Sequence, residues 1–563
     1  MKKLLKHITQ DANVGLNSTI ALIVLPSMIG VIIFILIYGF TPLNISNDKW
    51  ILSGYDESDI IQHYAGWLAY RNSDWKMPLG MAENMSVGSG TIISFTDSIP
   101  IVAIICKVLR RVLPETFQYF GFYTLLCYIL QCVGAFKIIH LKTQNIVYAT
   151  IGTVLFGFSP ILMERAFRHT ALGSQWIILF AIYIYLKSSE NIIWGGGIKY
   201  IFYLLLEILA IGIHPYFLPM VAVFALLTMI DDVRQKKFFT IVYLIGIQII
   251  SYLFGMIIGV LGNGISPSRE GYGFYSMNVN AIINPTSCGQ YTWSNILKTH
   301  PQILGNYDGF NYLGVGIFIL IIVFTVLTIL QKKQYIVFET FKRHIYLIFI
   351  CIFMICFAIS NVVTFNDKIL CTIPLPKLVE DLCGIFRASS RLFYPVYYLV
   401  YCFFIIYLYK VLDGNKNHAY GILIFIVGLQ LFDMHTCIIE KHKAMNDKKN
   451  YYSYIEDCGL DKISVKDGGL LLEEYYGDSR TLAVWAFKNN MRIYYWIANS
   501  GNYDKTVALS QGILANCKEN GDLGKNIIVT TSDETADFYR QFNVSIYEIE
   551  DSYFIYKDEK RFS

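Results

Sequence analysis

The chain has 563 residues, of which 55% are hydrophobic, 15% are aromatic and only 16% are charged, with a net charge of +4. An average soluble domain carries about 25% charged residues, and a soluble protein of this size lacks the interior for so much apolar surface. The composition excludes a disordered chain and indicates an integral membrane protein. The small positive charge suits basic cytoplasmic loops and gives no indication of nucleic-acid binding.

Long, continuous apolar runs predict a polytopic α-helical membrane protein rather than a β-barrel. The run from about Ser18 to Phe40 follows a basic start and is too long for a signal peptide, so we expect it to cross the membrane with the N-terminus inside. Further runs of similar character suit a hydrocarbon layer of about 30 Å. The eleven expected crossings lie near 18–40, 95–113, 117–140, 146–163, 172–187, 200–229, 239–262, 309–330, 344–361, 391–411 and 418–437.

The placement of Lys and Arg between these runs sets the expected orientation, because cytoplasmic loops are enriched in both residues. Long segments at 41–94, 263–308 and 362–390 then fall outside, as does the tail. The inner loops would carry Arg110 and Arg111, Arg165 and Arg168, and the basic groups near 234–237, 332–343 and 410–416. Residues 164–171 would reach the outer side only if an upstream segment re-entered the membrane, and the sequence leaves this open.

The tail differs in character, because charges and turn residues return. Asn526 opens a β-rich run, Ser532 or Asp533 caps a helix, and two strands flank the turn at Asp551 and Ser552. We therefore expect a transmembrane domain over 1–439 and a small extracytoplasmic α/β domain over 440–563.

The first outer segment carries the strongest candidates for chemistry. Asp59, Gln62 and His63 are spaced to share one helix face, beside tryptophans that suit the membrane surface. An alternative is a solvated acidic turn, in which Asp56 caps the helix or contacts a metal. Asp97 is most simply the N-cap of the second crossing.

Further candidates lie in later segments. Arg168 and His169 crowd the end of a crossing, where charged groups are costly and usually functional or paired. The arginines Arg387 and Arg391 are one helical turn apart and could clamp a phosphate or extend to lipid headgroups. Tyr275, Asn278 and Asp308 suit sugar binding, and they equally suit an ordered polar loop. His214 precedes a proline inside one apolar run, where its imidazole would satisfy the backbone carbonyl that Pro215 frees.

Several runs together resemble an uncharacterised bacterial membrane family of the GT-C glycosyltransferase type, related in layout to the YfhO-like proteins. They are SDIIQHYAGWLAYRNSDWKMPLG, SFTDSIP, RAFRHTALGSQW, GFYSMNVNAIINP with YDGFNYLG, and FRASSRLFYPVYY. The resemblance implies a multi-pass protein of the bacterial plasma membrane whose donor is a sugar linked to polyprenyl phosphate. It places the catalytic carboxylate on Asp59, with Gln62 and His63 beside it, and the donor phosphate on Arg391, with Arg387 second.

The expected activity is transfer of a sugar from this lipid-linked donor to a glycan or protein acceptor outside the cytoplasm, with Asp59 as general base. Some relatives use a divalent metal, Mg²⁺ or Mn²⁺, and others none, so the metal is left open. Asp308 stands where the family pattern has Glu. The alternatives are a non-catalytic accessory protein on the same scaffold and a transporter of lipid or polysaccharide.

Overall fold

The computed structural model describes most of the chain. The described residues are 16–53, 55, 59–88, 90–189, 197–262, 272–288, 291–412, 415–447, 459–460, 463, 465, 467–473, 479–494, 503–549 and 551–557. The protein is mostly helical, with a small sheet near its C-terminus. Asp56, one of the candidate residues, lies outside the described residues.

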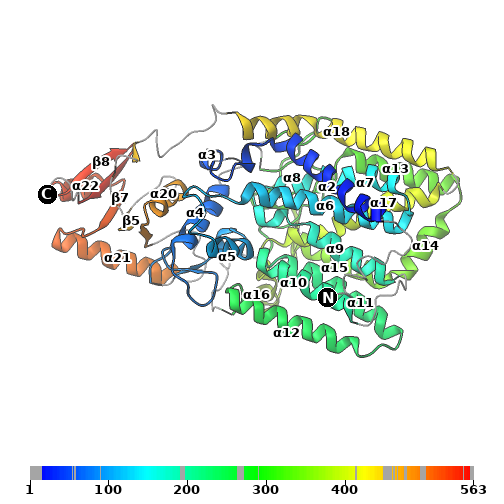
Figure 1. Cartoon of the computed structure of the whole chain (residues 1–563), viewed down its shortest axis with the longest axis horizontal. Coiled ribbons are helices and arrows are strands. Elements are labelled where there is room, and N and C mark those ends of the chain that lie inside the picture. The colour runs from blue at the N-terminus through cyan, green and yellow to red at the C-terminus, as the bar shows by residue number, and fades with distance from the viewer. Residues whose placement is uncertain are drawn as a thin grey trace.

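Apolar helices packed side by side form the larger part of the molecule (Figure 1). They are α2 (Leu16–Tyr38), α6 (Phe120–Thr143), α7 (Ile146–Gly157), α9 (Trp176–Ser189), α10 (Ile198–Ile213), α11 (Phe217–Arg234), α12 (Thr240–Ile258), α13 (Val315–Leu330), α14 (Gln334–Arg343), α15 (Ile345–Ile359), α17 (Tyr394–Val411) and α18 (Lys416–Asn446).

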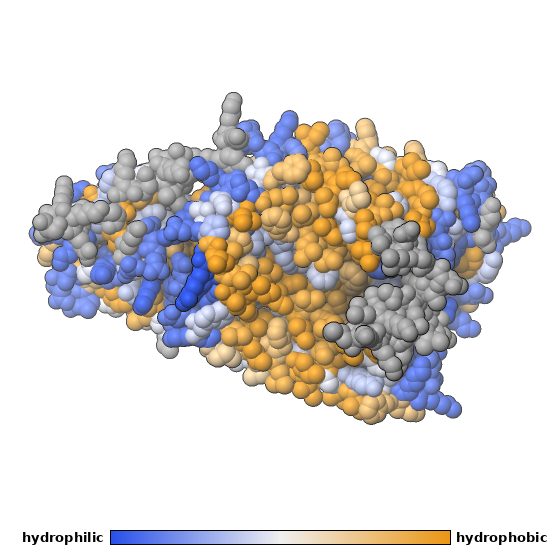
Figure 2. Space-filling view, in the orientation of Figure 1, coloured by the Kyte–Doolittle hydropathy of each residue, from blue (hydrophilic) through white to orange (hydrophobic). Residues whose placement is uncertain are grey.

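Among the described residues, five helices are long and apolar enough to cross a membrane, or six if α13 and α14, bent by 112°, count as one broken span. Much of the apolar surface is exposed: along α12, for example, Ile245, Ile249 and Leu253 point outward. Figure 2 shows a broad hydrophobic area over the middle of the visible face, with hydrophilic residues at both ends of the long axis. A surface of this kind fits a membrane protein.

Short elements connect these helices. They are η1 (Thr41–Leu43), α3 (Lys49–Leu52), α4 (Asp59–Asn72), β1 (Met81–Ala82), β2 (Thr91–Ile92), η2 (Ile93–Thr96), α5 (Pro100–Val108), α8 (Pro160–Arg165), η3 (Thr170–Gly173), η4 (Asn306–Gly309), β3 (Val362–Phe365), β4 (Lys368–Thr372), α16 (Lys377–Gly384) and η5 (Ser389–Phe393). Strands β1 and β2 form one antiparallel pair, and β3 and β4 form another.

Three expected crossings differ from the structure. The run at 146–163 contains α7 and, after a break at Phe158 and Ser159, the start of α8. The run at 95–113 holds only the nine residues of α5, about 14 Å of helix at 1.5 Å per residue, which is too short to cross. The run at 200–229 is divided into α10 and α11, because His214 is extended and Pro215 cannot continue the preceding helix.

The C-terminal part forms a five-stranded sheet in the order β6-β5-β7-β9-β8. Strand β5 pairs in parallel with β6 and β7, whereas β7 and β8 are antiparallel to β9. The predicted N-cap at Ser532 is confirmed, since its side chain accepts a hydrogen bond from the Thr535 N–H, and the predicted strand pair around 551–552 is also confirmed. The elements are β5 (Gly469–Glu473), α20 (Ser479–Lys488), β6 (Arg492–Ile493), α21 (Tyr503–Asn520), β7 (Asn526–Thr530), α22 (Asp533–Tyr539), β8 (Ser545–Ile549) and β9 (Ser552–Tyr556).

The C-terminal domain packs against the segment that follows α2. Lys488 on α20 lies 2.5 Å from the Asp48 carboxylate, and the Asn72 side chain donates to the Phe487 carbonyl at 2.9 Å. The Ile493 N–H donates to the carbonyl of Asn84, so β6 is hydrogen-bonded to this segment. Helix α18 extends to Asn446 and therefore crosses the domain boundary expected between 439 and 440.

Candidate functional site

Charged and imidazole side chains from connecting segments that are far apart in sequence meet at the end of the helical bundle nearest the C-terminal domain. They lie in or beside the short elements that connect the long helices, where the backbone leaves the apolar bundle and polar groups cost less to place. The group consists of Asp59 and His63 on α4, Asp97 after η2, Arg165 on α8, His169 before η3, His214 between α10 and α11, Asp308 in η4 and Arg391 in η5.

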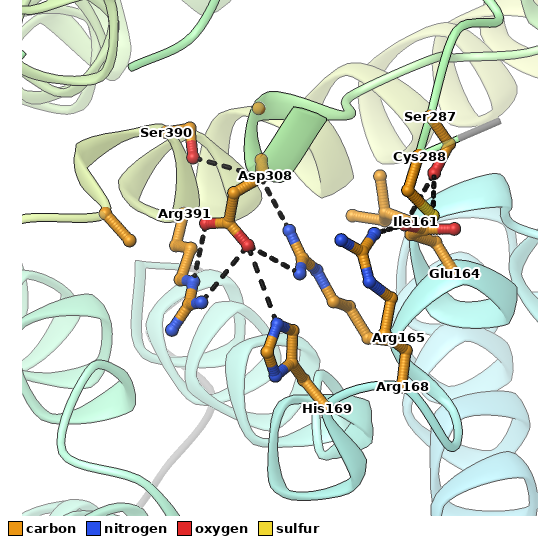
Figure 3. A network of polar contacts seen from close by, with 12 residues as sticks. Ile161, Glu164, Arg165, Arg168, His169, Ser287, Cys288, Asp308, Ser390 and Arg391 are labelled. Carbon is orange, nitrogen blue, oxygen red and sulfur yellow. Dashed lines mark hydrogen bonds and ion pairs between the residues drawn. The ribbon is translucent and has the colours of Figure 1, made fainter. Parts of the chain in front are cut away.

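Asp308 lies at the centre of an ionic network (Figure 3). Its carboxylate accepts a hydrogen bond of 2.8 Å from Arg165 and two from Arg391, at 3.0 and 3.1 Å. Its carbonyl accepts further bonds from Arg165 and from the Ser390 hydroxyl. Because two guanidiniums face one carboxylate, this network carries a net charge of +1.

This contact bears on the expected orientation of residues 164–171. Arg165 touches Asp308, so the two residues lie on the same side of any membrane. The expected topology, which separates Arg165 from Asp308, is therefore inconsistent at this point, because it counts the short helix α5 as a crossing. Arg110 and Arg111 follow α5 and lie on that same side, because Arg110 donates to the Arg71 carbonyl.

Three histidines surround Asp97. Its Oδ2 lies 3.8 Å from His63 Nε2 and 3.4 Å from His169 Nδ1, and its Oδ1 lies 3.5 Å from His214 Nε2. The Asp97 side chain is 16% exposed and that of His169 is 20% exposed, so solvent reaches this group. His169 also connects the two carboxylates, since its Nε2 lies 3.7 Å from Asp308 Oδ1.

The backbone that carries Asp97 is strained. Asp97 has φ +57° and Ile99 has φ +54°, a left-handed conformation that a β-branched side chain such as Ile99 rarely adopts. The segment is held against α4 by the Ser98 hydroxyl, which donates to the His63 carbonyl at 2.6 Å. Gly66 permits the close approach, because a Cβ there would overlap the Thr96 side chain. Strain of this kind concentrates at functional sites, and Asp97 is not the predicted N-cap.

Asp59 begins α4, one helical turn before His63, and its side chain is 29% exposed. Arg480 of the C-terminal domain approaches it, with Nη1 3.5 Å from Asp59 Oδ1. Burial raises the pKa of Asp59, and the charge of Arg480 acts in the opposite direction. Gln62 is half-buried on the same helix.

The three carboxylates of the site differ in acidity. Burial alone would raise the pKa of Asp308, but the charges of Arg165 and Arg391 lower it overall, so this group stays ionised. Burial raises the pKa of Asp97 to about 6. Burial, with a smaller effect of Arg480, lowers the pKa of His63 to about 3, so its imidazole is neutral. The site thus combines Asp308, which stays ionised, with Asp59 and Asp97, whose raised pKa values make them easier to protonate.

Arg168 lies beside this network rather than in it. It pairs with Glu164 one turn away on the chain, and its guanidinium lies 5.4 Å from the centre of the Tyr307 ring. Glu164 also accepts a hydrogen bond from the Ser287 hydroxyl at 2.7 Å (Figure 3).

The remaining candidates, Arg387, Tyr275 and Asn278, lie in the segments before α13 and before α17. The guanidinium of Arg387 lies 5.6 Å from the Tyr275 ring, and that of Arg391 lies 5.1 Å from the Tyr216 ring, so the two arginines have separate aromatic partners. Asn278 is buried and joins its loop to the β3–β4 hairpin, donating to the Asn366 carbonyl at 2.7 Å. This contact gives Asn278 a structural role.

Sequence reasoning gave too little weight to Asp97, Arg165 and His214. The sequence predicts Arg165 on the side opposite Asp308, Asp97 mainly as a helix cap, and His214 within a crossing. The His-Pro pair was the available signal for His214, since an extended residue before proline also marks a helix end.

A pocket of about 540 Å³ lies between the segment at 41–94 and the C-terminal domain, lined by Asn72, Glu83 and Arg492 among others. It adjoins the end of α4, whereas Asp59 begins that helix of 14 residues, about 20 Å away at 1.5 Å per residue. It is therefore separate from the ionic site.

The sequence profile of one family, described as a domain of unknown function, DUF6311, matches residues 27–435. The chain belongs to the DUF6311 family. No curated protein matches the chain at the threshold applied. The DUF6311 region contains every residue of the ionic site except Arg480, which the C-terminal domain supplies.

Proposed function

We propose that this DUF6311 protein is an integral membrane glycosyltransferase of the GT-C type that moves a sugar from a polyprenyl-phosphate-linked donor to an extracytoplasmic acceptor. One observation carries the proposal: an accessible carboxylate of raised pKa, Asp59, shares a site with the arginine network of Asp308 at one end of an apolar helical bundle. A lipid-borne anion and a soluble acceptor would meet at such a place.

The proposed topology keeps eleven crossings, now formed by α2, α6, α7, α9, α10, α11, α12, α13, α15, α17 and α18. The loss of α5 and the division of the run at 200–229 offset each other, so the N-terminus is inside and the C-terminal domain outside. Basic groups then lie at the inner helix ends, such as Lys236 and Lys237 before α12 and Lys332 and Lys333 after α13, in keeping with the positive-inside rule for a bacterial plasma membrane.

In the proposed reaction the acceptor oxygen attacks the anomeric carbon while Asp59 takes the hydroxyl proton. The bond between that carbon and the phosphate oxygen breaks, and the lipid leaves as polyprenyl phosphate. Asp308 occupies Nε and Nη2 of Arg391, which leaves the Nη1 group to bind the departing phosphate. Asp59 suits the role of base better than Asp308, since the arginine charges deprive Asp308 of basicity.

The test combines mass spectrometry of lipids that co-purify with the protein and sugar transfer in nanodiscs. We expect a polyprenyl-phosphate sugar to be retained, and Asp59→Asn to lower the transfer rate by roughly 10²- to 10⁴-fold, the usual cost of losing a general base. Asp537→Asn, an exposed carboxylate paired with Arg540, serves as the matched control.

The alternative is a non-catalytic member of the same scaffold, which the saturation of Asp308 by two arginines favours, because a fully paired network can serve stability alone. A protein that retains the lipid but transfers no sugar with several donors would support this alternative. A fully active Asp59→Asn variant would instead remove Asp59 from the mechanism.

A further inference from the structure

The hydrogen bonds around Asp97 determine which ring nitrogens carry protons. The Thr170 hydroxyl donates to the Phe167 carbonyl, so its oxygen is left to accept from His63 Nδ1, 3.2 Å away. A neutral His63 then has its hydrogen on Nδ1 and directs the lone pair of Nε2 toward Asp97.

His169 follows the same logic. Its Nε2 faces the ionised carboxylate of Asp308 at 3.7 Å, so a neutral ring places its hydrogen there. The Nδ1 lone pair then faces Asp97 Oδ2 at 3.4 Å. Three electron-rich atoms, from His63, His169 and Asp97, therefore converge, all within 4.8 Å of one another.

A cation placed between acceptors that face one another at these distances would offset their mutual repulsion. The separations of 3.4 and 3.8 Å are long for hydrogen bonds, but two ligands of a tetrahedral metal with bonds of about 2.1 Å stand roughly 3.4 Å apart. We propose that His63, Asp97 and His169 bind a divalent transition-metal ion at the outer end of the helical bundle.

The surroundings also fit a metal site, because metal-bound histidines usually donate their other N–H to an oxygen nearby. Thr170 accepts the hydrogen bond of His63 in this way, and Asp308 faces Nε2 of His169 at 3.7 Å. His214 orients the third ligand: its Nδ1 accepts from the Tyr216 N–H, so its Nε2–H points to Asp97 Oδ1, 3.5 Å away.

The ligand types define the class of ion. Two imidazoles and one carboxylate suit Zn²⁺, Mn²⁺ or Fe²⁺, whereas Mg²⁺ prefers oxygen ligands and keeps several waters. Three protein ligands with solvent access leave a position open, which is typical of catalytic rather than structural metal sites. The site does not depend on the sugar-transfer proposal, and metal content is measured without any transfer assay.

The experiment titrates Co²⁺ into full-length, chelator-treated protein in detergent, followed by visible d–d absorption and, after desalting, by elemental analysis with Zn²⁺. We expect one equivalent per chain, loss of the absorption bands in His63→Ala and His169→Ala, and affinity roughly tenfold lower in Thr170→Val. His344→Gln is the matched control, because His344 is another half-buried histidine, bonded to the Tyr185 hydroxyl at 2.9 Å between α14 and α15.

The rival explanation is a proton held by Asp97 in place of a metal. Folded wild-type protein that takes up neither Co²⁺ nor Zn²⁺ stoichiometrically would overturn the proposal, as would unchanged bands in His169→Ala. Should a histidine variant fail to fold, Asp97→Asn supplies the second measurement. Its size-exclusion profile should match wild type, and it should lose the rise in melting temperature that Zn²⁺ gives the wild type.

Discussion

Asp59 and Asp308 are both aspartates near arginines, yet their surroundings give them opposite properties. Asp308 faces two guanidiniums and stays ionised, whereas Asp59 has one arginine, Arg480, at 3.5 Å and a pKa that burial raises. Only the two arginines around Asp308 keep their carboxylate ionised at every pH near neutral. We therefore make a separate prediction for each of the two carboxylates.

The pH profile of sugar transfer should depend on Arg480. Because the charge of Arg480 lowers the pKa of Asp59, Arg480→Gln should raise that pKa, so the base is protonated at a higher pH. The acidic limb of the rate profile should therefore move to higher pH, while Arg540→Gln, in the same domain, leaves it in place. An acidic limb that stays fixed in Arg480→Gln would show that Asp59 does not set it.

Asp308→Asn should destabilise the protein. It leaves the guanidinium of Arg165, which is fully buried, without its anion, and breaking a buried pair from one side costs about 3–5 kcal/mol. Because the folded-state pKa of Asp308 is lowered, its contribution is complete above the ordinary pKa of about 4 and is lost only as pH falls further. Thermal unfolding should show the same loss at every pH between about 5 and 8, and a loss that varied across this range would contradict the assignment.

Helix length decides the orientation of the site. The nine residues of α5 cannot span the hydrocarbon layer, and the break at His214 creates a helical hairpin from one apolar run. The shortness of α5 and the break at His214 both depend on where helices end rather than on how apolar the run is. They bring His214, between α10 and α11, to Asp97, and Thr170, before α9, lies beside His63 on α4.

Cysteine labelling should distinguish the proposed topology, in which α5 does not cross the membrane, from the expected one, in which the run at 95–113 is a crossing. Arg111→Cys, just beyond α5, should react with an impermeant thiol reagent added to intact cells or spheroplasts, since Arg111 is exposed and the proposed topology places it outside. Lys236→Cys, between α11 and α12, should react only after the membrane is opened. Labelling of both variants in intact cells, or of neither, would contradict the proposed arrangement.

The C-terminal domain completes the site from outside the DUF6311 region. It contacts the first outer segment through α20 and β6, and it supplies Arg480 to Asp59. The domain is therefore part of the candidate site, and its docking should be measurable.

Lys488→Glu should loosen this docking, because it sets a negative charge against the Asp48 carboxylate. The partly exposed pair contributes on the order of 1 kcal/mol, so amide hydrogen exchange should quicken several-fold in α4 and α20. Lys557→Glu, whose partner Asp522 lies within the same domain, should leave α4 unchanged. Equal exchange in both variants would mean that α20 does not hold the domain in place.

The sequence by itself determined the membrane class, most helix positions, three of the five strands of the C-terminal sheet and the polar segments that hold the site. These follow from local hydrophobicity and from caps and turns, which act over a few residues. Only the tertiary structure decided that Arg165 meets Asp308, that three histidines surround Asp97 and that Arg480 reaches Asp59. Those contacts join segments separated by up to several hundred residues, and counting the short helix α5 as a crossing separates Arg165 from Asp308, which the structure brings together.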